Sequence, residues 1–336
     1  MLLATLCADL IVTNAPISVQ LPVSYLDKPD WVQYLQQRPT DRFYFGGRVR
    51  GGLDPRDIDS PISATISGSA RSIEIRTMMQ GRAVPTASGW RVRDAIAYDL
   101  PNLFPADYER FVTRFETASR PQRLAFLSNA GVRYCVMPVP PRPDATPLAE
   151  VEALEGMKLY DCDPQASRVY VTPPWGMVEP DPQKQVEMLF NPSFDAKRML
   201  LLFTEPPPPA GVAGTPPPAT YARFTQDGPS DIEIAAGVSA QGGFLVLDDT
   251  YDDDWHVEVD GQPAPMLKAN AVFRAVRLAP GEHRVQFHYR PQPVLYGALL
   301  SGGALLGLLA TGLWPRRQRA ISSVEVPLSV ASTPSL

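Results

Sequence analysis

Five aspartates gather within residues 248–256, which read DDTYDDDWH. Such a run allows three interpretations: a metal loop, a pair of catalytic carboxylates, or an acidic turn. Calcium loops place oxygen ligands at alternate positions around a flexible turn, whereas this run has no glycine and no distal glutamate at EF-hand distance. Paired carboxylates for glycoside hydrolysis face each other across a cleft, which neighbours on one loop rarely do. The pattern favours a solvated acidic turn at a hairpin tip, which also keeps strand edges apart.

Aromatic residues beside these aspartates are candidates for binding a glycan. Trp255 is favoured as a core residue of a strand, with a sugar-stacking platform as the alternative. Tyr251 and Asp254 complete the set of candidate glycan contacts.

Other chemistry-bearing residues do not form a recognisable constellation. His256, His283 and His288 lack metal-ligand spacing, and no nucleophile motif accompanies them. The sequence has no Walker loop, no GxGxxG and no HExxH. We therefore expect no catalytic residue, no metal site and no cofactor-binding residue in this chain.

Composition and cysteine content exclude several classes of protein. The 336 residues have a formal net charge of −5, which gives no sign of a nucleic-acid binder. Cys7, Cys135 and Cys162 form neither a disulfide framework nor a zinc site. Cys135 and Cys162 can pair in an oxidising compartment, although a small buried thiol is the commoner fate.

Hydrophobic patterns predict an α+β fold. Helical periodicity at residues 29–38, 106–117 and 121–131 alternates with strand candidates at 42–45, 132–137, 157–161 and 168–172. From residue 231 the apolar residues recur with period two, and Asp260-Gly261 is a hairpin signal. The prediction is a mixed α/β extracytoplasmic domain, then a small antiparallel β-sandwich, then a C-terminal transmembrane helix.

The C-terminal apolar run gives the clearest topological signal. Residues 294–314 contain no charge over 21 positions, enough to span a hydrocarbon core as a helix, with a buried core helix as the alternative. Arg316, Arg317 and Arg319 follow, so the positive-inside rule puts that side in the cytoplasm. Gly303 and Gly307 have a spacing that suits packing against other membrane helices, of the same or a partner protein.

We accordingly divide the chain into six segments. They are residues 1–12, the outer end of a truncated membrane helix; 13–204, the mixed α/β domain; 205–220, a Pro-rich linker or loop; 221–293, the β-sandwich; 294–314, the transmembrane helix; and 315–336, a cytoplasmic tail.

The stretch from residue 244 to residue 291, followed by an apolar helix, resembles the C-terminal end of bacterial YfhO-family membrane proteins. Stretches at DLPNLFPADYERF, FLSNAGVRYCVM and LYDCDPQASRVYV also look like the extracytoplasmic domain of that family. The chain departs from the family pattern at residues 252–254, where three aspartates replace a Tyr-Pro-Gly-like turn. The matching residues are Asp249-Thr250-Tyr251, Trp255, Val259-Asp260-Gly261, Ala269-Asn270, Phe273-Arg274-Ala275-Val276, Pro280-Gly281, His283, Val285, Phe287, Tyr289 and Pro291.

The resemblance implies polyprenyl-phosphate-dependent glycosylation of cell-envelope polymers at the bacterial cell membrane. It also implies that the catalytic acid lies in the first extracytoplasmic loop, among N-terminal membrane helices that we do not expect in this chain. We expect the chain to be the non-catalytic extracytoplasmic C-terminal part of such a protein, with a cell-envelope glycan as a candidate partner. The alternative is a membrane-anchored β-sandwich that binds glycan or a partner protein and is not an enzyme. A calcium-stabilised surface module is a third hypothesis.

Overall fold

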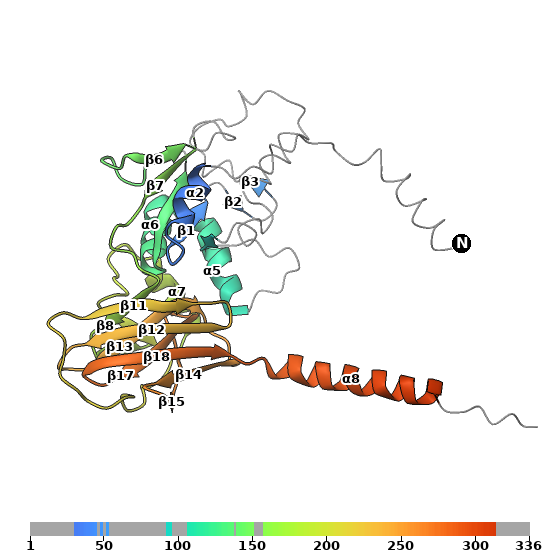
Figure 1. Ribbon diagram of the computed structural model, residues 1–336. Coiled ribbons are helices and arrows are strands. Elements are labelled where there is room, and N and C mark those ends of the chain that lie inside the picture. The colour runs from blue at the N-terminus through green and yellow to red at the C-terminus, as the bar shows by residue number, and fades with distance from the viewer. Residues whose placement is uncertain are drawn as a thin grey trace, which may run out of the picture. The chain divides into compact units, whose positions relative to one another are not determined.

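The computed structural model describes residues 30–45, 48–49, 52–53, 92–95, 106–137, 139–150 and 157–313 (Figure 1). The expected helix end at residues 1–12 and the expected tail at residues 315–336 lie outside these described residues. Helices and several β-sheets coexist in the described part, so the α+β class is confirmed.

The first sheet combines parallel and antiparallel strands in the order β4-β1-β5-β7-β6. Strands β4, β1 and β5 are parallel, whereas β7 pairs antiparallel with both β5 and β6. A short two-stranded ladder of β2 and β3 is separate. The strands are β1 (Arg42–Phe45), β2 (Arg48–Val49), β3 (Gly52–Leu53), β4 (Arg93–Asp94), β5 (Val132–Met137), β6 (Pro147–Glu150) and β7 (Lys158–Asp161).

Helices pack on both faces of this first sheet because its side chains alternate. Phe43 and Tyr134 pack with the buried face of α2 (Asp30–Gln36) in one apolar cluster. Tyr44 and Cys135 point the other way, into a cluster with α5 (Ala106–Thr117), α6 (Arg120–Asn129) and α7 (Pro182–Leu189). Ser119 caps α6, and Gly131 follows its end with a φ of 68°.

Two further sheets share one core and form a β-sandwich. One has the strand order β8-β13-β17-β16-β10-β9, and the other has the order β11-β12-β18-β14-β15. Leu245, Leu247 and Val276 of the first sheet pack against Ile234, Val285 and Phe287 of the second. The strands are β8 (Val169–Thr172), β9 (Gly176–Val178), β10 (Leu200–Leu202), β11 (Tyr221–Asp227), β12 (Asp231–Val238), β13 (Gly243–Thr250), β14 (Trp255–Val259), β15 (Gln262–Ala264), β16 (Leu267–Ala269), β17 (Phe273–Leu278) and β18 (Gly281–Tyr289).

The sandwich draws on more of the chain than residues 221–293. Strands β8, β9 and β10 come from the sequence before residue 205, and β8 forms one edge of the six-stranded sheet beside β13. The strand predicted at residues 168–172 is confirmed as β8, although the sequence analysis placed it in the α/β domain. The sequence analysis did not predict β9 and β10, because short pairings over long sequence distances give no local signal.

The Pro-rich stretch is held along the sandwich by backbone hydrogen bonds. The N–H of Ala210 donates to the Arg277 carbonyl, and the N–H of Ala279 donates to the Ala210 carbonyl. The N–H of Gly214 donates to the Pro280 carbonyl. A proline-rich segment lacks donors for a full ladder, so these few bonds fix it as an ordered loop.

Helix α8 (Gln292–Leu313) belongs to a separate unit that starts at Pro291. Large apolar side chains on it are exposed, among them Leu300, Leu306 and Leu308. Among the described residues, no helix combines the length and apolarity needed to cross a membrane.

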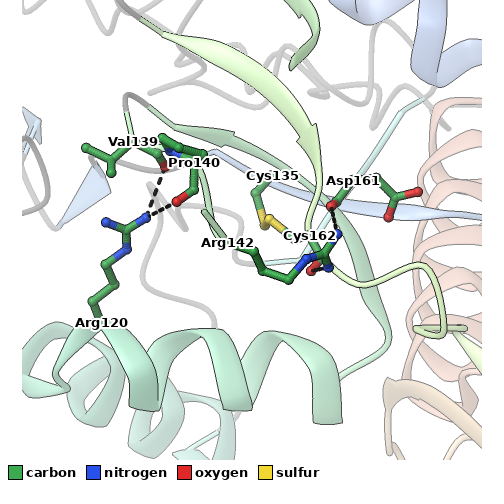
Figure 2. Close-up of a disulfide and its surroundings, with 7 residues drawn as sticks. All are labelled: Arg120, Cys135, Val139, Pro140, Arg142, Asp161 and Cys162. Atoms are coloured by element: carbon green, nitrogen blue, oxygen red, sulfur yellow. Dashed lines mark hydrogen bonds between the residues drawn. A yellow bond between two sulfur atoms is a disulfide. The ribbon is translucent and has the colours of Figure 1, made fainter. Parts of the chain in front are cut away.

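Cys135 and Cys162 form a disulfide, with 5.8 Å between their Cα atoms (Figure 2). The expectation that favoured a free buried thiol was wrong, because β5 and β7 are antiparallel neighbours although 27 residues separate the two cysteines. The Arg142 guanidinium donates to the Cys162 carbonyl at 2.8 Å and fixes the chain just after β7.

Removal of this disulfide by the double substitution Cys135→Ser and Cys162→Ser should lower the free energy of unfolding by about 3 kcal/mol. The reason is that the bond closes a loop of intermediate length in the unfolded chain. Urea unfolding of the wild type and of the double variant measures the change. A thiol titration of the denatured, unreduced wild-type chain should find one thiol per chain, and three thiols would contradict the pairing.

Candidate functional site

Asp249 is surrounded by three arginines from three different strands or strand ends. Its Oδ1 accepts hydrogen bonds from Arg42 Nη2 and Arg168 Nε, both at 2.8 Å. Its Oδ2 accepts from Arg168 Nη2 at 2.8 Å and lies 3.2 Å from Arg274 Nη2. Bidentate bonds between a guanidinium and a carboxylate are strong and directional. Asp249 therefore fixes β1, the start of β8 and β17 relative to one another.

A second carboxylate extends this arginine cluster. Arg168 also donates to both oxygens of Asp227, at 2.7 and 3.0 Å. Arg93, on β4, contacts the same Asp227 carboxylate at 2.7 Å. The four arginines and two aspartates thus join the first sheet to both sheets of the sandwich. We call this set the arginine cluster: Arg42, Arg93, Arg168, Arg274, Asp227 and Asp249.

The charge state of Asp249 follows from these neighbours. Burial alone would raise the pKa of its carboxyl, but the charges and hydrogen bonds of Arg168, Arg42 and Arg274 outweigh burial and hold the pKa well below its usual range. Burial, together with the charges of Arg168 and Arg42, lowers the pKa of the Arg274 guanidinium to about 10 against the opposing pull of Asp249. Asp249 is thus ionised at any physiological pH.

Asp248 has a different environment from its neighbour. The register of β13 against β17 shifts between Leu247 and Thr250, so both aspartates lie in a β-bulge. Asp248 is fully buried, and its Oδ1 accepts a hydrogen bond from the Tyr170 hydroxyl at 3.3 Å. Burial raises the pKa of this carboxyl well above its ordinary value and so favours its protonated form.

The acidic stretch is therefore not one solvated turn, as the sequence indicated. Asp248 is buried and Asp249 is partly buried, whereas Asp252 and Asp253 are exposed in a turn that continues to the half-buried Asp254. Within it, the N–H of Asp254 donates to Asp252 Oδ1, and the Tyr251 hydroxyl donates to Asp253 Oδ1. The hairpin interpretation is also wrong, because β13 and β14 belong to different sheets. The turn crosses from one sheet of the sandwich to the other.

A pocket of about 450 Å³ lies beside the arginine cluster. Seven of its fifteen lining residues are aromatic, and Arg42, Thr250 and Asp252 contribute polar groups. The rings of Trp255 and Tyr289 pair across β14 and β18, with centroids 5.1 Å apart. The aromatic lining residues are Tyr108, Phe111, Phe126, Tyr251, Trp255, Phe273 and Tyr289.

The structure brings together two of the three candidate glycan contacts. Trp255 and Tyr251 both line the pocket, whereas Asp254 is not among the lining residues. The Trp255 ring also stacks under the Arg274 guanidinium, 4.0 Å from the ring centroid. Contact with a glycan remains a prediction for all three residues.

The sequence analysis did not identify several residues of the site. Arg42 and Tyr289 line the pocket, and Arg168 links the two aspartates of the cluster. Asp249 and Arg274 stand in the family-like motifs but had no assigned role. Long-range pairing brings them together: 207 residues separate Arg42 from Asp249, and 81 separate Arg168 from Asp249. The only available signal was the presence of charged residues inside apolar strands.

The histidines are used structurally. His283 is buried, and its two ring nitrogens face Asp260 Oδ2 at 2.8 Å and the Ala279 carbonyl at 2.9 Å. His256 and His288 are register partners across β14 and β18. Within the part of the chain that the structure describes, no three His, Cys, Asp or Glu side chains form a group that could hold a metal ion.

Asp249→Asn should lower the free energy of unfolding by about 3–5 kcal/mol, because three arginines lose the charge that balances them in a buried site. Asp253→Asn, in the exposed turn, is the matched control and should change stability by less than about 0.5 kcal/mol. Chemical denaturation of both variants measures the difference. Equal, small effects would show that the cluster does not hold the sheets together.

Asp248→Asn should make the protein more stable at pH 7. Because burial raises the pKa of Asp248, folding favours its protonated form. The group therefore costs no stability below the ordinary carboxyl range, and its cost grows as pH rises above that range. Asparagine keeps the shape and the acceptor without that cost. The gain over wild type should shrink as the pH of the denaturation experiment falls from 7 towards 4. If the stability difference between the variant and the wild type does not change with pH, the pKa of Asp248 is not raised.

Comparison with known proteins yields one match. Residues 225–301, from the end of β11 into α8, match the family described as "Bacterial membrane protein YfhO". No curated protein and no solved structure matches the chain. The matched segment includes Asp227, Asp249, Trp255 and Arg274, so it covers the sandwich side of both the cluster and the pocket. Over residues 225–301 the resemblance to the YfhO family of bacterial membrane proteins is thus confirmed.

Proposed function

We propose that this chain is the non-catalytic extracytoplasmic C-terminal part of a YfhO-like polytopic membrane protein that serves polyprenyl-phosphate-dependent glycosylation of cell-envelope polymers. Its task there is to hold a glycan. The observation that supports this most is the aromatic pocket beside Arg42. It has the size of an ordinary small-ligand site and a few polar groups among apolar walls.

The pocket suits a sugar ring because such a ring has an apolar and a polar aspect. The C–H faces of a pyranose can pack on the rings of Trp255, Tyr251 and Tyr289, which supply large, rigid contact surfaces. The hydroxyls at the edge of the sugar can then bond to Arg42 and Thr250. A purely apolar ligand would make no use of these polar groups.

Two features support an extracytoplasmic position for the pocket. The disulfide between Cys135 and Cys162 persists in oxidising compartments and is rare in the cytosol. The apolar run at residues 294–314 starts a few residues after β18 and ends before Arg316 and Arg317. As a membrane helix it would place these arginines in the cytoplasm and the sandwich outside. Lipid or neighbouring helices would then cover the exposed leucines of α8.

The state of the buried carboxylates supports a non-catalytic role. A general base must be able to accept a proton near working pH, and Asp249 cannot, because three arginines hold it ionised. Asp248 is buried against Tyr170 and does not line the pocket. The pocket supplies aromatic surfaces, the Arg42 cation and the exposed carboxylate of Asp252, and the proposal assigns the chemistry to other parts of the membrane protein.

The alternative is a membrane-anchored sandwich that binds glycan or a partner protein by itself. It uses the same pocket and differs only in needing no catalytic partner. Transfer of sugar from a polyprenyl-phosphate donor by the purified chain would contradict both versions, since each assigns no catalysis to this chain.

Trp255→Ala should weaken glycan binding at least tenfold, because it removes the largest stacking surface of the pocket. The measurement is calorimetric titration of the full chain in lipid nanodiscs with cell-envelope oligosaccharides. Trp175→Ala is the matched control, since Trp175 is exposed and lies outside the pocket lining.

A second pocket variant guards against a folding defect in the first. Tyr251→Ala removes a wall residue at the edge of the exposed turn and should also weaken binding. If both variants bind glycan as the wild type does, the pocket is not the glycan site.

A further inference from the structure

The wall of the pocket at Arg42 is backed by a surplus of positive charge. Four arginines of the cluster face two carboxylates, Asp227 and Asp249. The neighbouring Asp248 is buried, and burial raises the pKa of its carboxyl well above the ordinary value, which favours the protonated form. The side chains of Arg168 and Arg274 are 1% and 3% exposed, so solvent screens them little.

Arg274 shows that the surplus is not fully compensated within the described residues. Its Nη1 is buried and has no hydrogen-bond partner there. Its guanidinium lies against the Trp255 ring, which forms part of the pocket wall. Low-dielectric surroundings extend the influence of such charges, so the pocket beside them has a positive potential.

Arg42 is the member of the cluster that also lines the pocket. Its side chain is 14% exposed, and its hydrogen bonds run to Asp249 and to the Ala130 carbonyl. These bonds engage two of the five N–H groups of a guanidinium. The remaining donors can bind an anion at the pocket wall with charge-assisted hydrogen bonds.

Three acids of one turn, Asp252, Asp253 and Asp254, oppose this potential at the rim, and the Tyr251 hydroxyl donates to Asp253 Oδ1. Asp252 lines the pocket, but it is exposed, and its Oδ1 already accepts the hydrogen bond from the Asp254 N–H. Water and ions screen an exposed carboxylate far more than they screen the buried arginines. The buried cations therefore dominate the wall at Arg42.

We propose that the pocket selects a saccharide that has an acidic group, with the Arg42 guanidinium binding the anion and Trp255 and Tyr289 packing on the sugar face. This inference rests on the proposed function, in which the pocket holds a glycan. A uronic acid carboxylate and a sugar phosphate share the required chemistry, which is one anionic group next to a pyranose ring.

Three matched ligands separate the effect of the anion from that of the sugar ring. Methyl glucoside, methyl glucuronide and methyl glucoside 6-phosphate share one ring and differ only at C6, as hydroxymethyl, carboxylate and phosphate. Titration of the full chain in nanodiscs, followed by ligand-observed NMR, gives each dissociation constant. We expect the two acidic sugars to bind at least tenfold more tightly than the neutral one, with a preference that falls as salt is raised. The better of the two acidic ligands identifies the source of the anion.

Arg42→Gln tests the residue itself. It removes one cation while Arg168 and Arg274 continue to balance Asp249, so the fold should tolerate it. The variant should bind all three ligands about equally, because the guanidinium that prefers an anion is gone and the amide that replaces it bonds to a hydroxyl or an anion without a net charge. Arg284→Gln is the matched control, because Arg284 is exposed, pairs with Glu233 and does not line the pocket. It should keep the full acidic preference.

The possible results separate failure of the acidic preference, failure of the role of Arg42 and failure of the proposed function. Equal binding of neutral and acidic sugars by the wild type would overturn the acidic preference and leave the glycan pocket standing. An acidic preference that survives in Arg42→Gln would overturn the role of Arg42. If the wild type binds none of the three ligands and no cell-envelope oligosaccharide, the proposed function fails and this inference fails with it.

Discussion

The carboxylate of Asp249 is the interaction on which the arrangement of the sheets depends. It accepts hydrogen bonds from Arg42 on β1 and from Arg168 just before β8, and it pairs with Arg274 on β17. These elements belong to the first sheet and to the sandwich. Breaking a buried ion pair on one side leaves an uncompensated charge, which is far more costly than losing a surface pair. The cluster therefore specifies how the first sheet and the sandwich are placed relative to each other within residues 30–290.

Asp248 and Asp249 lie where the register of β13 against β17 shifts, between Leu247 and Thr250. Neighbouring side chains of a strand point to opposite faces of the sheet. Asp248 continues the face of Phe244 and Val246, which packs with Tyr170, whereas Asp249 reaches the arginines. The chain then crosses to the second sheet, which brings Tyr251 and Trp255 to the pocket.

Residues of the family-like motifs that lay far apart in sequence meet around this crossing. Arg274 binds Asp249 and stacks on Trp255. Asn270 has a φ of 45° and accepts the N–H of Leu201 through its side chain, so it fixes the corner before β17. The motifs therefore support a corner of the sandwich, and the pocket lies beside that corner.

The sequence by itself determined the local elements: the helix at 106–117, the strands at 42–45 and 132–137, the turn at Asp260-Gly261 and the YfhO-family segment. Period, capping and turn residues act over a few positions, so they can be read from neighbours along the chain. Tertiary structure alone decided which of the five aspartates are buried, that Cys135 meets Cys162, and that Arg42 stands at the pocket. Each of these depends on pairing between strands remote in sequence, and a charge reveals its role only when its partner and its burial are known.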